Sequence, residues 1–286
     1  MNTKPVILVT GANGQLGKEL KQMEPVFPGF RFIFLSREDL PIHHFELVRN
    51  FFKGYQPTYL INCAAYTAVD RAESEKELAF QVNGESVGVL AAVCKEYDTR
   101  FIHISTDYVF DGKGKTAYTP ESPTNPQSVY GASKLEGEQQ ALLYNPGSII
   151  IRTSWVYSEF GKNFVKTILR LLNEKEDLDV VNDQVGSPTY AADLARVILD
   201  IIASGKWVPG IYHYCNEGII SWYEFAVAIK ELTKSNCRIH PVPSAQYPTA
   251  AKRPAYSVLD TAKLRETYST GSRNWKESLA ACMARL

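Results

Sequence analysis

The 286-residue chain has few cysteines and no disulfide pattern, which excludes a class of small secreted proteins. Its five cysteines are scattered, odd in number and never spaced C-x-x-C; they are Cys63, Cys94, Cys215, Cys237 and Cys282. This usage indicates a reducing cytoplasm, with neither a disulfide framework nor a zinc knuckle, and we expect no bound metal.

The sequence also lacks net charge and long apolar runs. Lysine plus arginine (31) equals aspartate plus glutamate (31), so no summed field attracts nucleic acid or an anionic membrane. No run approaches the length of a membrane span, and the N-terminal MNTKPVILVTG has too short an apolar core for a signal peptide. We therefore expect a soluble, cytoplasmic protein with a small-molecule partner.

What the first half does contain is a regular alternation of apolar runs with segments long enough for helices. The runs, rich in β-branched or aromatic residues, are Val6–Thr10, Phe30–Leu35, Tyr59–Cys63, Phe101–Ser105 and Ile149–Arg152. Unbroken runs of this kind suit strands that are buried on both faces of a parallel sheet. The pattern predicts an α/β protein with a doubly wound parallel sheet of the Rossmann type.

The second half is less regular. Helices are predicted at Asn163–Asn173, Asp193–Ser204, Trp222–Thr233 and Arg273–Leu286. We expect residues 1–153 to form a dinucleotide-binding domain, joined by part of 185–205. Most of 154–286 would then form a smaller, irregular α/β lobe that lies over the carboxyl edge of the sheet and binds the substrate.

A glycine run, VTGANGQLGKEL, follows the first predicted strand and opens a helix. In such a turn the first glycine permits tight bending, the second lets backbone approach a pyrophosphate, and the third lets the helix pack closely. The spacing is G-x-x-G-x-x-G, and a turn without any ligand is the alternative. The candidate cofactor contacts here are Gly11, Asn13, Gly14, Gln15, Leu16 and Gly17.

The second predicted strand ends in FLSRED. Dinucleotide folds that select NAD usually place an acidic residue here, whereas an arginine accommodates the 2′-phosphate of NADP. Ser36 and Arg37 hold this place and favour NADP, although Glu38 and Asp39 follow at once and an ordinary solvated arginine is the alternative.

Two further stretches carry candidate chemistry. In YGASK, Tyr130 and Lys134 are four residues apart on a predicted helix that Asn125 would cap, and an ammonium beside a phenol lowers the phenol's pKa towards the working range. In ISTDYVFDG, polar side chains gather where a strand ends. That second stretch is either part of an active site or a simple turn built from Ser105, Thr106 and Asp107.

Together these motifs resemble the dTDP-4-dehydrorhamnose reductase family, a branch of the extended short-chain dehydrogenase/reductases. The resemblance runs nearly end to end and rests on NCAAYTAVDRAE, STDYVFDG, VYGASKLEGE, RTSWVYSEFGKNFVKTILRL, VNDQVGSPTYAADLA and AKRPAYSVLD. It implies a catalytic triad of Thr106, Tyr130 and Lys134. NADPH would give hydride to C4 of a 4-keto-6-deoxy nucleotide sugar, Tyr130 would protonate the alkoxide, and Lys134 would hold the nicotinamide ribose.

The resemblance also implies binding residues one at a time. Those for the cofactor are Gly14, Gln15 and Leu16 at the pyrophosphate, Ala65, Tyr66 and Thr67 at the nicotinamide half, and Ile42 at the adenine. Those for the sugar nucleotide, besides Thr106 and Tyr130, are Asp107, Trp155, Asn163, Gln184 and Arg253, the last gripping the diphosphate.

The chain departs from the family at two places. Pro41 and Ile42 stand where an acidic and an aliphatic residue are common, and Arg285 lies where some members carry a metal-binding carboxylate between subunits. Monomer and homodimer stay open, as does use of NADH. Two other functions remain: a non-catalytic NADP-binding regulatory subunit of the methionine adenosyltransferase type, and a reductase or epimerase of another nucleotide deoxysugar.

Overall fold

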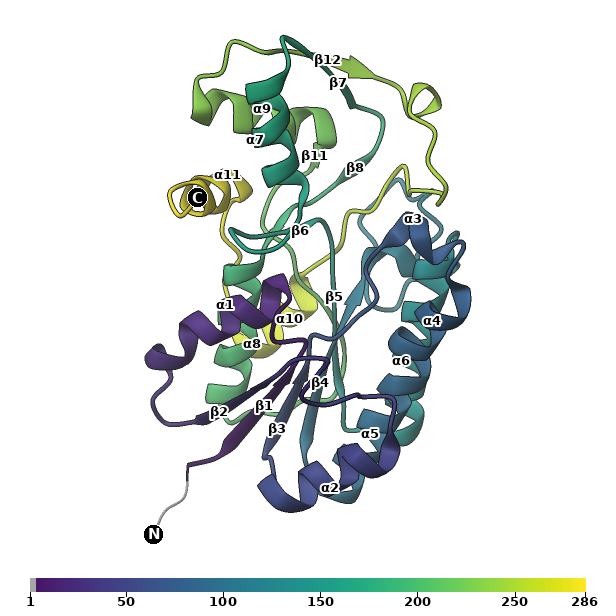
Figure 1. Cartoon of the computed structure of the whole chain (residues 1–286), viewed down its shortest axis with the longest axis vertical. Coiled ribbons are helices and arrows are strands. Elements are labelled where there is room, and N and C mark those ends of the chain that lie inside the picture. The colour runs from purple at the N-terminus through teal and green to yellow at the C-terminus, as the bar shows by residue number, and fades with distance from the viewer. Residues whose placement is uncertain (1–3) are drawn as a thin grey trace.

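A parallel six-stranded sheet forms the lower half of the molecule in Figure 1, which shows a computed structural model describing residues 4–286. The strand order is β2-β1-β3-β4-β5-β10, and every neighbouring pair is parallel. The strands are β1 (Val6–Thr10), β2 (Arg31–Leu35), β3 (Tyr59–Asn62), β4 (Arg100–Thr106), β5 (Ile149–Thr153) and β10 (Gly210–His213). The chain reverses its direction of travel across the sheet between β1 and β3, which is where such sheets bind ligands.

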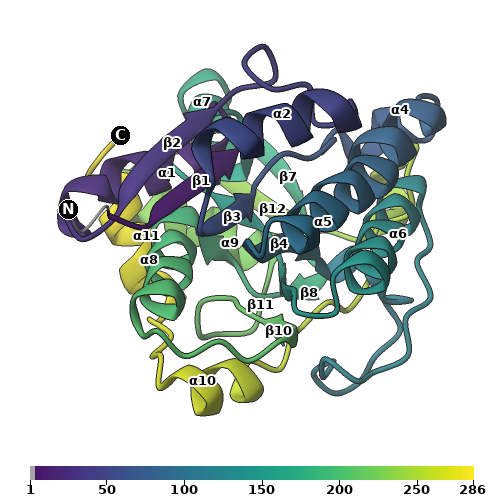
Figure 2. The same cartoon turned by 90° about the horizontal axis from the view of Figure 1, so that it is seen from below.

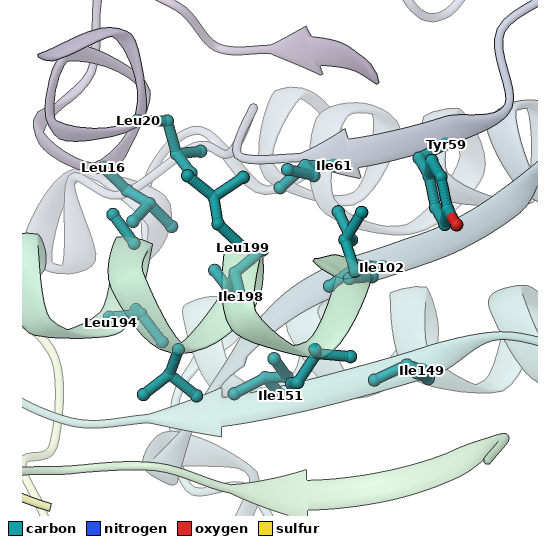
Figure 3. Packing of buried hydrophobic residues seen from close by; sticks show 14 of the residues in the cluster. Leu16, Leu20, Tyr59, Ile61, Ile102, Ile149, Ile151, Leu194, Ile198 and Leu199 are labelled. Carbon is teal, nitrogen blue, oxygen red and sulfur yellow. The ribbon is translucent and has the colours of Figure 1, made fainter. Parts of the chain in front are cut away.

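Helices cover both faces of the sheet, as the view from below shows (Figure 2). One face packs on α1 (Gln15–Met23) and α8 (Ala191–Ala203), and the other on α2 (Phe45–Tyr55), α5 (Ser86–Glu96) and α6 (Val129–Tyr144). Because strand side chains alternate, consecutive residues of one strand serve opposite faces. Figure 3 shows Ile61, Ile102 and Ile151 of the sheet gathered around Ile198 and Leu199 of α8, in one hydrophobic cluster.

The predicted fold class is confirmed, and the five predicted strands begin and end within one residue of β1 to β5. The sixth strand, β10, was missed because its sequence, GIYH, is short and lacks an apolar run. It pairs with β5 and so adds a strand to the sheet, although it lies outside residues 1–153, the predicted dinucleotide-binding domain. The division into two lobes stays a prediction.

The upper half of Figure 1 has a hydrophobic cluster of its own around Phe225, which is fully buried, and we refer to the elements that form this cluster as the smaller lobe. Its helices are α7 (Phe164–Glu174), α9 (Trp222–Thr233) and α11 (Trp275–Met283). Its short strands form three pairs: β6 (Val156–Tyr157) with β9 (Thr189–Tyr190), β7 (Asp177–Val181) with β12 (Arg238–Val242), and β8 (Val185–Gly186) with β11 (Ile220–Ser221).

Three short helices complete the elements named here: α3 (Val69–Ala72), α4 (Lys76–Phe80) and α10 (Ala262–Tyr268). A π-helical turn, Gln81–Glu85, joins α4 to α5. No helix within residues 4–286 combines the length and the apolar character that crossing a bilayer would require.

A buried ion pair ties α6 to the sheet. Arg152 on β5 donates two hydrogen bonds to Glu138 on α6, Nε to Oε1 at 2.8 Å and Nη2 to Oε2 at 2.7 Å. The Ser105 hydroxyl at the end of β4 also donates to Glu138, at 2.5 Å. Both charged side chains are about as buried as the core, at 3% and 2% exposed. The pair therefore fixes the helix that carries Tyr130 and Lys134.

We predict that Arg152→Leu lowers the free energy of unfolding by about 3–5 kcal/mol, because it leaves a buried carboxylate without its cation. Urea denaturation measures this change. The matched control is Arg196→Leu, which breaks an exposed pair with Asp200 on α8 and should cost under about 1 kcal/mol. Equal losses in the two variants would contradict the role given to the buried pair.

Candidate active site

Two adjoining cavities open at the carboxyl ends of the strands. The first, of about 500 Å³, lies beside the glycine turn and the end of β2, and the second, of about 600 Å³, extends towards the smaller lobe. Gly14, Cys63 and Ala65 line both. The two cavities therefore form one continuous site at the point where the strand order reverses, between β1 and β3.

The glycine turn leaves room for a ligand at one position only. Gly11 has φ +68°, and a Cβ there would lie 2.6 Å from the backbone of Cys63 and Ala64. A Cβ on Gly17 would lie 2.4 Å from Gly11 O, whereas one on Gly14 would meet protein no closer than 3.2 Å. The first and third glycines are thus required by the protein's own packing.

The start of α1 is free to bind an anion. Gly14 stands at its N-cap and provides no side-chain hydrogen bond to the first turn. The backbone N–H groups of that turn, with the positive end of the helix dipole, therefore face the cavity that Gly14, Gln15, Leu16 and Gly17 line.

The end of β2 shapes the opposite side of the first cavity. Ser36, Arg37 and Ile42 line it, as the sequence predicted, together with Glu38. Asp39 instead turns back, and its carboxylate accepts a hydrogen bond from Ser36 N at 2.8 Å. Arg37 takes part in no ion pair found among residues 4–286 and is exposed. A guanidinium without a carboxylate partner among these residues therefore lines the first cavity at the end of β2, the position for which the sequence predicted a contact with a 2′-phosphate.

The segment after β3 is held by a residue that the sequence analysis missed. Asn83, in the π-helical turn, accepts from Tyr66 N at 2.8 Å and donates to Tyr66 O at 3.0 Å and to Ser133 Oγ at 3.0 Å. It thereby clamps the strand-end loop that contains Ala65, Tyr66 and Thr67 against α6. Its signal in the sequence is weak, since one asparagine within a helical stretch reads as a surface residue.

Helix α6 carries Tyr130 and Lys134 one turn apart, and both line the second cavity. The expected cap is wrong: α6 begins at Val129, and Ser128 caps it by accepting from Gly131 N at 3.1 Å. Asn125 lies outside the helix, where its backbone N–H donates to Val109 O. Ser128, and not Asn125, caps α6 because Ser128 directly precedes the helix and has the extended backbone that an N-cap residue adopts.

The electrostatics of the pair also differ from expectation. Burial raises the pKa of Tyr130 to about 12, and the Thr106 hydroxyl only partly offsets this rise. Burial lowers the pKa of Lys134 to about 8. The predicted lowering of the tyrosine pKa by the lysine is therefore not found, because in this dry site desolvation disfavours both charged forms.

Thr106 and Asp107 form a turn and also line a cavity, so they combine the two alternatives, a simple turn or part of an active site, that the sequence left open. Thr106 caps the short helical turn after β4, where its Oγ1 accepts from Tyr108 N at 3.3 Å and donates to Asp107 Oδ1 at 2.9 Å. Both residues also line the second cavity. Burial raises the pKa of Asp107 to about 6, and its Oδ2 has no hydrogen-bond partner within residues 4–286.

Trp155 forms an aromatic wall where the second cavity meets the smaller lobe. Its ring stacks on Trp222, with centroids 3.6 Å apart and planes 10° from parallel, and both line the cavity. Its φ of +48° is rare for a bulky residue and is typical of functional sites. Trp222 was not foreseen because it lies far along the chain at the start of α9.

Three predicted substrate residues do not line either cavity. Asn163 caps α7 and donates to Gln15 Oε1 at 2.9 Å, so it joins the lobe to the glycine turn. Gln184 donates to Ser244 Oγ at 3.0 Å. Arg253 makes a two-pronged pair with Asp70 on α3, at 3.0 and 2.8 Å, beside a small depression next to Tyr108.

The region that prompted the expectation of no metal contains Arg285, which pairs with Glu159 at 2.7 Å and lies 3.6 Å from Glu19. Within residues 4–286, no group of three His, Cys, Asp or Glu side chains is arranged to hold a metal ion. The expectation of no metal stays a prediction.

Comparison with known proteins places these features in a family. A family model described as RmlD substrate binding domain matches residues 5–286. The chain is 43% identical to the spore coat polysaccharide biosynthesis protein SpsK of Bacillus subtilis (strain 168), covering 96% of this chain and 95% of that protein. It is 40% identical to a dTDP-4-dehydrorhamnose reductase of Aggregatibacter actinomycetemcomitans, covering 96% of each.

Two further likenesses bear on substrate and cofactor. A dTDP-4-keto-6-deoxy-D-glucose reductase of Streptomyces niveus is 37% identical, over 95% of this chain and 94% of that protein. The crystal structure of a Bacillus anthracis str. Ames dTDP-4-dehydrorhamnose reductase in complex with NADP superposes with a TM-score of 0.95. It is 36% identical, and the match covers 99% of this chain and all of that one.

The glycine turn allows a test that separates ligand binding from folding. We predict that Gly14→Ala keeps the melting temperature within a few degrees but weakens NADP(H) binding at least tenfold, because Gly14 lines both cavities and the added methyl group would meet protein no closer than 3.2 Å, at Gly11 O. Gly17→Ala should lower the melting temperature, because its Cβ would collide with Gly11 O. Calorimetry and fluorescence titration measure the two effects. Unchanged cofactor affinity in Gly14→Ala would remove the turn from the binding site.

Proposed function

The chain belongs to the family described as RmlD substrate binding domain, and on that basis we propose that it is an NAD(P)-dependent oxidoreductase. It reduces the C4 keto group of dTDP-4-dehydro-L-rhamnose to give dTDP-L-rhamnose, with NADPH as the hydride donor. The reductase from Aggregatibacter and the NADP complex from Bacillus anthracis support this substrate and this cofactor.

One observation carries the proposal: Thr106, Tyr130 and Lys134 line a cavity that is continuous with the cavity of the glycine turn. Residues of both cavities would hold a dinucleotide anchored at the start of α1, and Thr106, Tyr130 and Lys134 would then line the part of the site where its nicotinamide supplies hydride. A binding module has no need to combine a dinucleotide site with a buried proton donor. The arrangement therefore favours the enzyme over a regulatory subunit.

The bound nicotinamide supplies hydride, and the chain supplies the proton. Tyr130 is the proton donor, and its raised pKa keeps the phenol protonated at neutral pH. A general acid must hold its proton until negative charge develops on the substrate oxygen. Thr106 lies beside the phenol and orients it, and Lys134 lies one turn further along α6 to hold the ribose.

The sugar would lie between the strand ends and the smaller lobe. The buried Oδ2 of Asp107 has no hydrogen-bond partner among residues 4–286, which suits a sugar hydroxyl. The stacked pair of Trp155 and Trp222 offers a flat apolar face against the ring. Buried polar groups of this kind reject sugars that leave them unpaired.

Cofactor preference follows from the end of β2. Arg37 is free to meet a 2′-phosphate, and Asp39 is turned away from the cavity by its hydrogen bond to Ser36. Glu38 lines the same cavity and opposes the phosphate. We therefore propose a severalfold preference for NADPH over NADH, since a single exposed arginine contributes only about 1 kcal/mol.

A second substrate class is supported by the relative from Streptomyces, whose name specifies a different 4-keto-6-deoxy sugar. Such sugars differ in configuration at ring carbons, and the same proton donor and cofactor serve both. The alternative activity is thus reduction of another dTDP-4-keto-6-deoxy sugar.

The deciding experiment mixes the purified chain with NADPH and a panel of nucleotide 4-keto-6-deoxy sugars. We predict the highest kcat/KM for dTDP-4-dehydro-L-rhamnose. The reaction is monitored by the loss of NADPH absorbance at 340 nm, and the product is then identified. Tyr130→Phe should bind NADPH normally but lose at least about a hundredfold in kcat, the usual contribution of a general acid. Near-normal turnover in that variant would exclude Tyr130 as the acid, and higher kcat/KM for another sugar would favour the second substrate class.

The ion pair of Arg253 and Asp70 yields a separate prediction. If Arg253 grips the diphosphate, Arg253→Ala should raise the KM for the nucleotide sugar about tenfold, as expected for a charge-assisted hydrogen bond of about 1.5–3 kcal/mol. Asp70→Asn is the matched control, because it breaks the same pair but keeps the guanidinium, and its KM should stay near normal. A purely structural pair would instead give both variants the same lowered melting temperature and an unchanged KM.

A further inference from the structure

A row of buried polar side chains runs beneath the site and ends at Lys134. Asn62, the last residue of β3, lies 3.1 Å from His103 on β4, measured from its Nδ2 to the ring Nδ1. The other ring nitrogen, Nε2, lies 3.3 Å from Lys134 Nζ. Asn62, His103 and Lys134 are each at most 2% exposed, so water does not mediate these contacts.

The backbone determines which end of the Asn62 amide faces the histidine. Ala64 N–H, which can only donate, lies 3.2 Å from Asn62 Oδ1, and the Thr10 hydroxyl donates to the same oxygen at 2.7 Å. The oxygen is therefore the acceptor at that end. It follows that the amide NH₂ points to His103 and donates to its Nδ1.

This donation fixes the tautomer of His103. Burial and the nearby lysine lower the imidazole pKa well below its usual value, so the ring is neutral. A neutral imidazole carries one N–H, and Nδ1 is occupied as an acceptor, so the hydrogen is on Nε2. His103 thus presents a donor, not a lone pair, to Lys134.

The hydrogen bonds of Lys134 are complete only for a neutral amine. Its Nζ donates to Ile104 O at 2.6 Å, and its lone pair can accept from His103 Nε2–H. One N–H is left for the cavity that Lys134 lines. An ammonium has no lone pair, so it would set N–H against N–H at 3.3 Å.

We propose that Asn62 and His103 are positioning residues that favour the neutral amine of Lys134 over its ammonium, with one N–H of the amine aimed into the cofactor cavity. The other titratable groups near Lys134 do not reverse this. Glu138 is already bound by Arg152 and Ser105, and burial raises the pKa of the Cys63 thiol, which keeps it neutral. Tyr130, one turn away, is also neutral. The pKa of Lys134 is lowered by burial to about 8, so the neutral amine becomes the main form above that pH, well below the range in which an exposed lysine loses its proton.

The inference rests on the proposed function only in assigning Lys134 to the binding of the cofactor. The tautomer itself can be tested on the ligand-free chain. Nitrogen NMR of protein labelled with ¹⁵N-histidine distinguishes the two ring nitrogens, and His103→Gln identifies the His103 signals among five histidines. We expect the hydrogen on Nε2 from pH 6 to pH 8. Hydrogen on Nδ1, or a charged ring, would overturn the proposal whatever the enzyme's substrate.

Asn62→Asp supplies the second test, because a carboxylate accepts where the amide donated. His103 should then carry its hydrogen on Nδ1 and offer a lone pair to Lys134, which favours the ammonium. An anionic cofactor binds the ammonium more tightly than the amine. The alkaline loss of NADPH affinity should therefore move to higher pH by about one unit or more in the variant.

The matched control is Ile102→Val, which perturbs the same buried strand without touching the polar row. It should leave both the histidine tautomer and the pH profile of the NADPH Kd unchanged. A purely structural role for Asn62 and His103 predicts lowered stability in Asn62→Asp with the same pH profile as the parent. That result, or a shift of equal size in the control, would overturn the proposal.

Discussion

The structure depends on one constraint: polar groups at the carboxyl ends of β3, β4 and β5 are buried under α6 and must find their partners in protein. A buried polar group without a partner costs about 1–3 kcal/mol, and a buried charge costs more. The chain meets this constraint twice. Ser105, Glu138 and Arg152 form one closed set, and Asn62, His103 and Lys134 form the other. Together they hold α6, and with it Tyr130 and Lys134, in a single position.

Burial also explains why the site is electrostatically different from the one the motif suggests. In water, an ammonium beside a phenol lowers the phenol's pKa. Here desolvation outweighs that attraction, so Tyr130 keeps its proton and Lys134 loses some of its charge. A ligand that brings negative charge into the cavity shifts the balance towards the ammonium. Binding of an anionic ligand is therefore coupled to the protonation of Lys134.

Local patterns in the sequence were enough for the sheet and for part of the site. Apolar runs identified β1 to β5, and the glycine spacing identified the tight turn between β1 and α1, because both are encoded by neighbouring residues. The cap of α6 was misjudged since Asn125 and Ser128 are both good capping residues, and only the packed position of the helix decides between them. Strand β10, Asn83 and Trp222 were missed because their roles depend on contacts with distant parts of the chain.

Several contacts join the smaller lobe to residues around the two cavities, and two of them involve predicted site residues. Asn163 joins α7 to Gln15 in the glycine turn, and Arg253 joins the loop before α10 to Asp70, whose neighbour Val69 lines the second cavity. Asp70 and Arg253 are partly exposed, so separating them would not leave a buried charge without a partner. The proposed contact of Arg253 with a diphosphate would therefore require only that one exposed anion replace another beside the guanidinium.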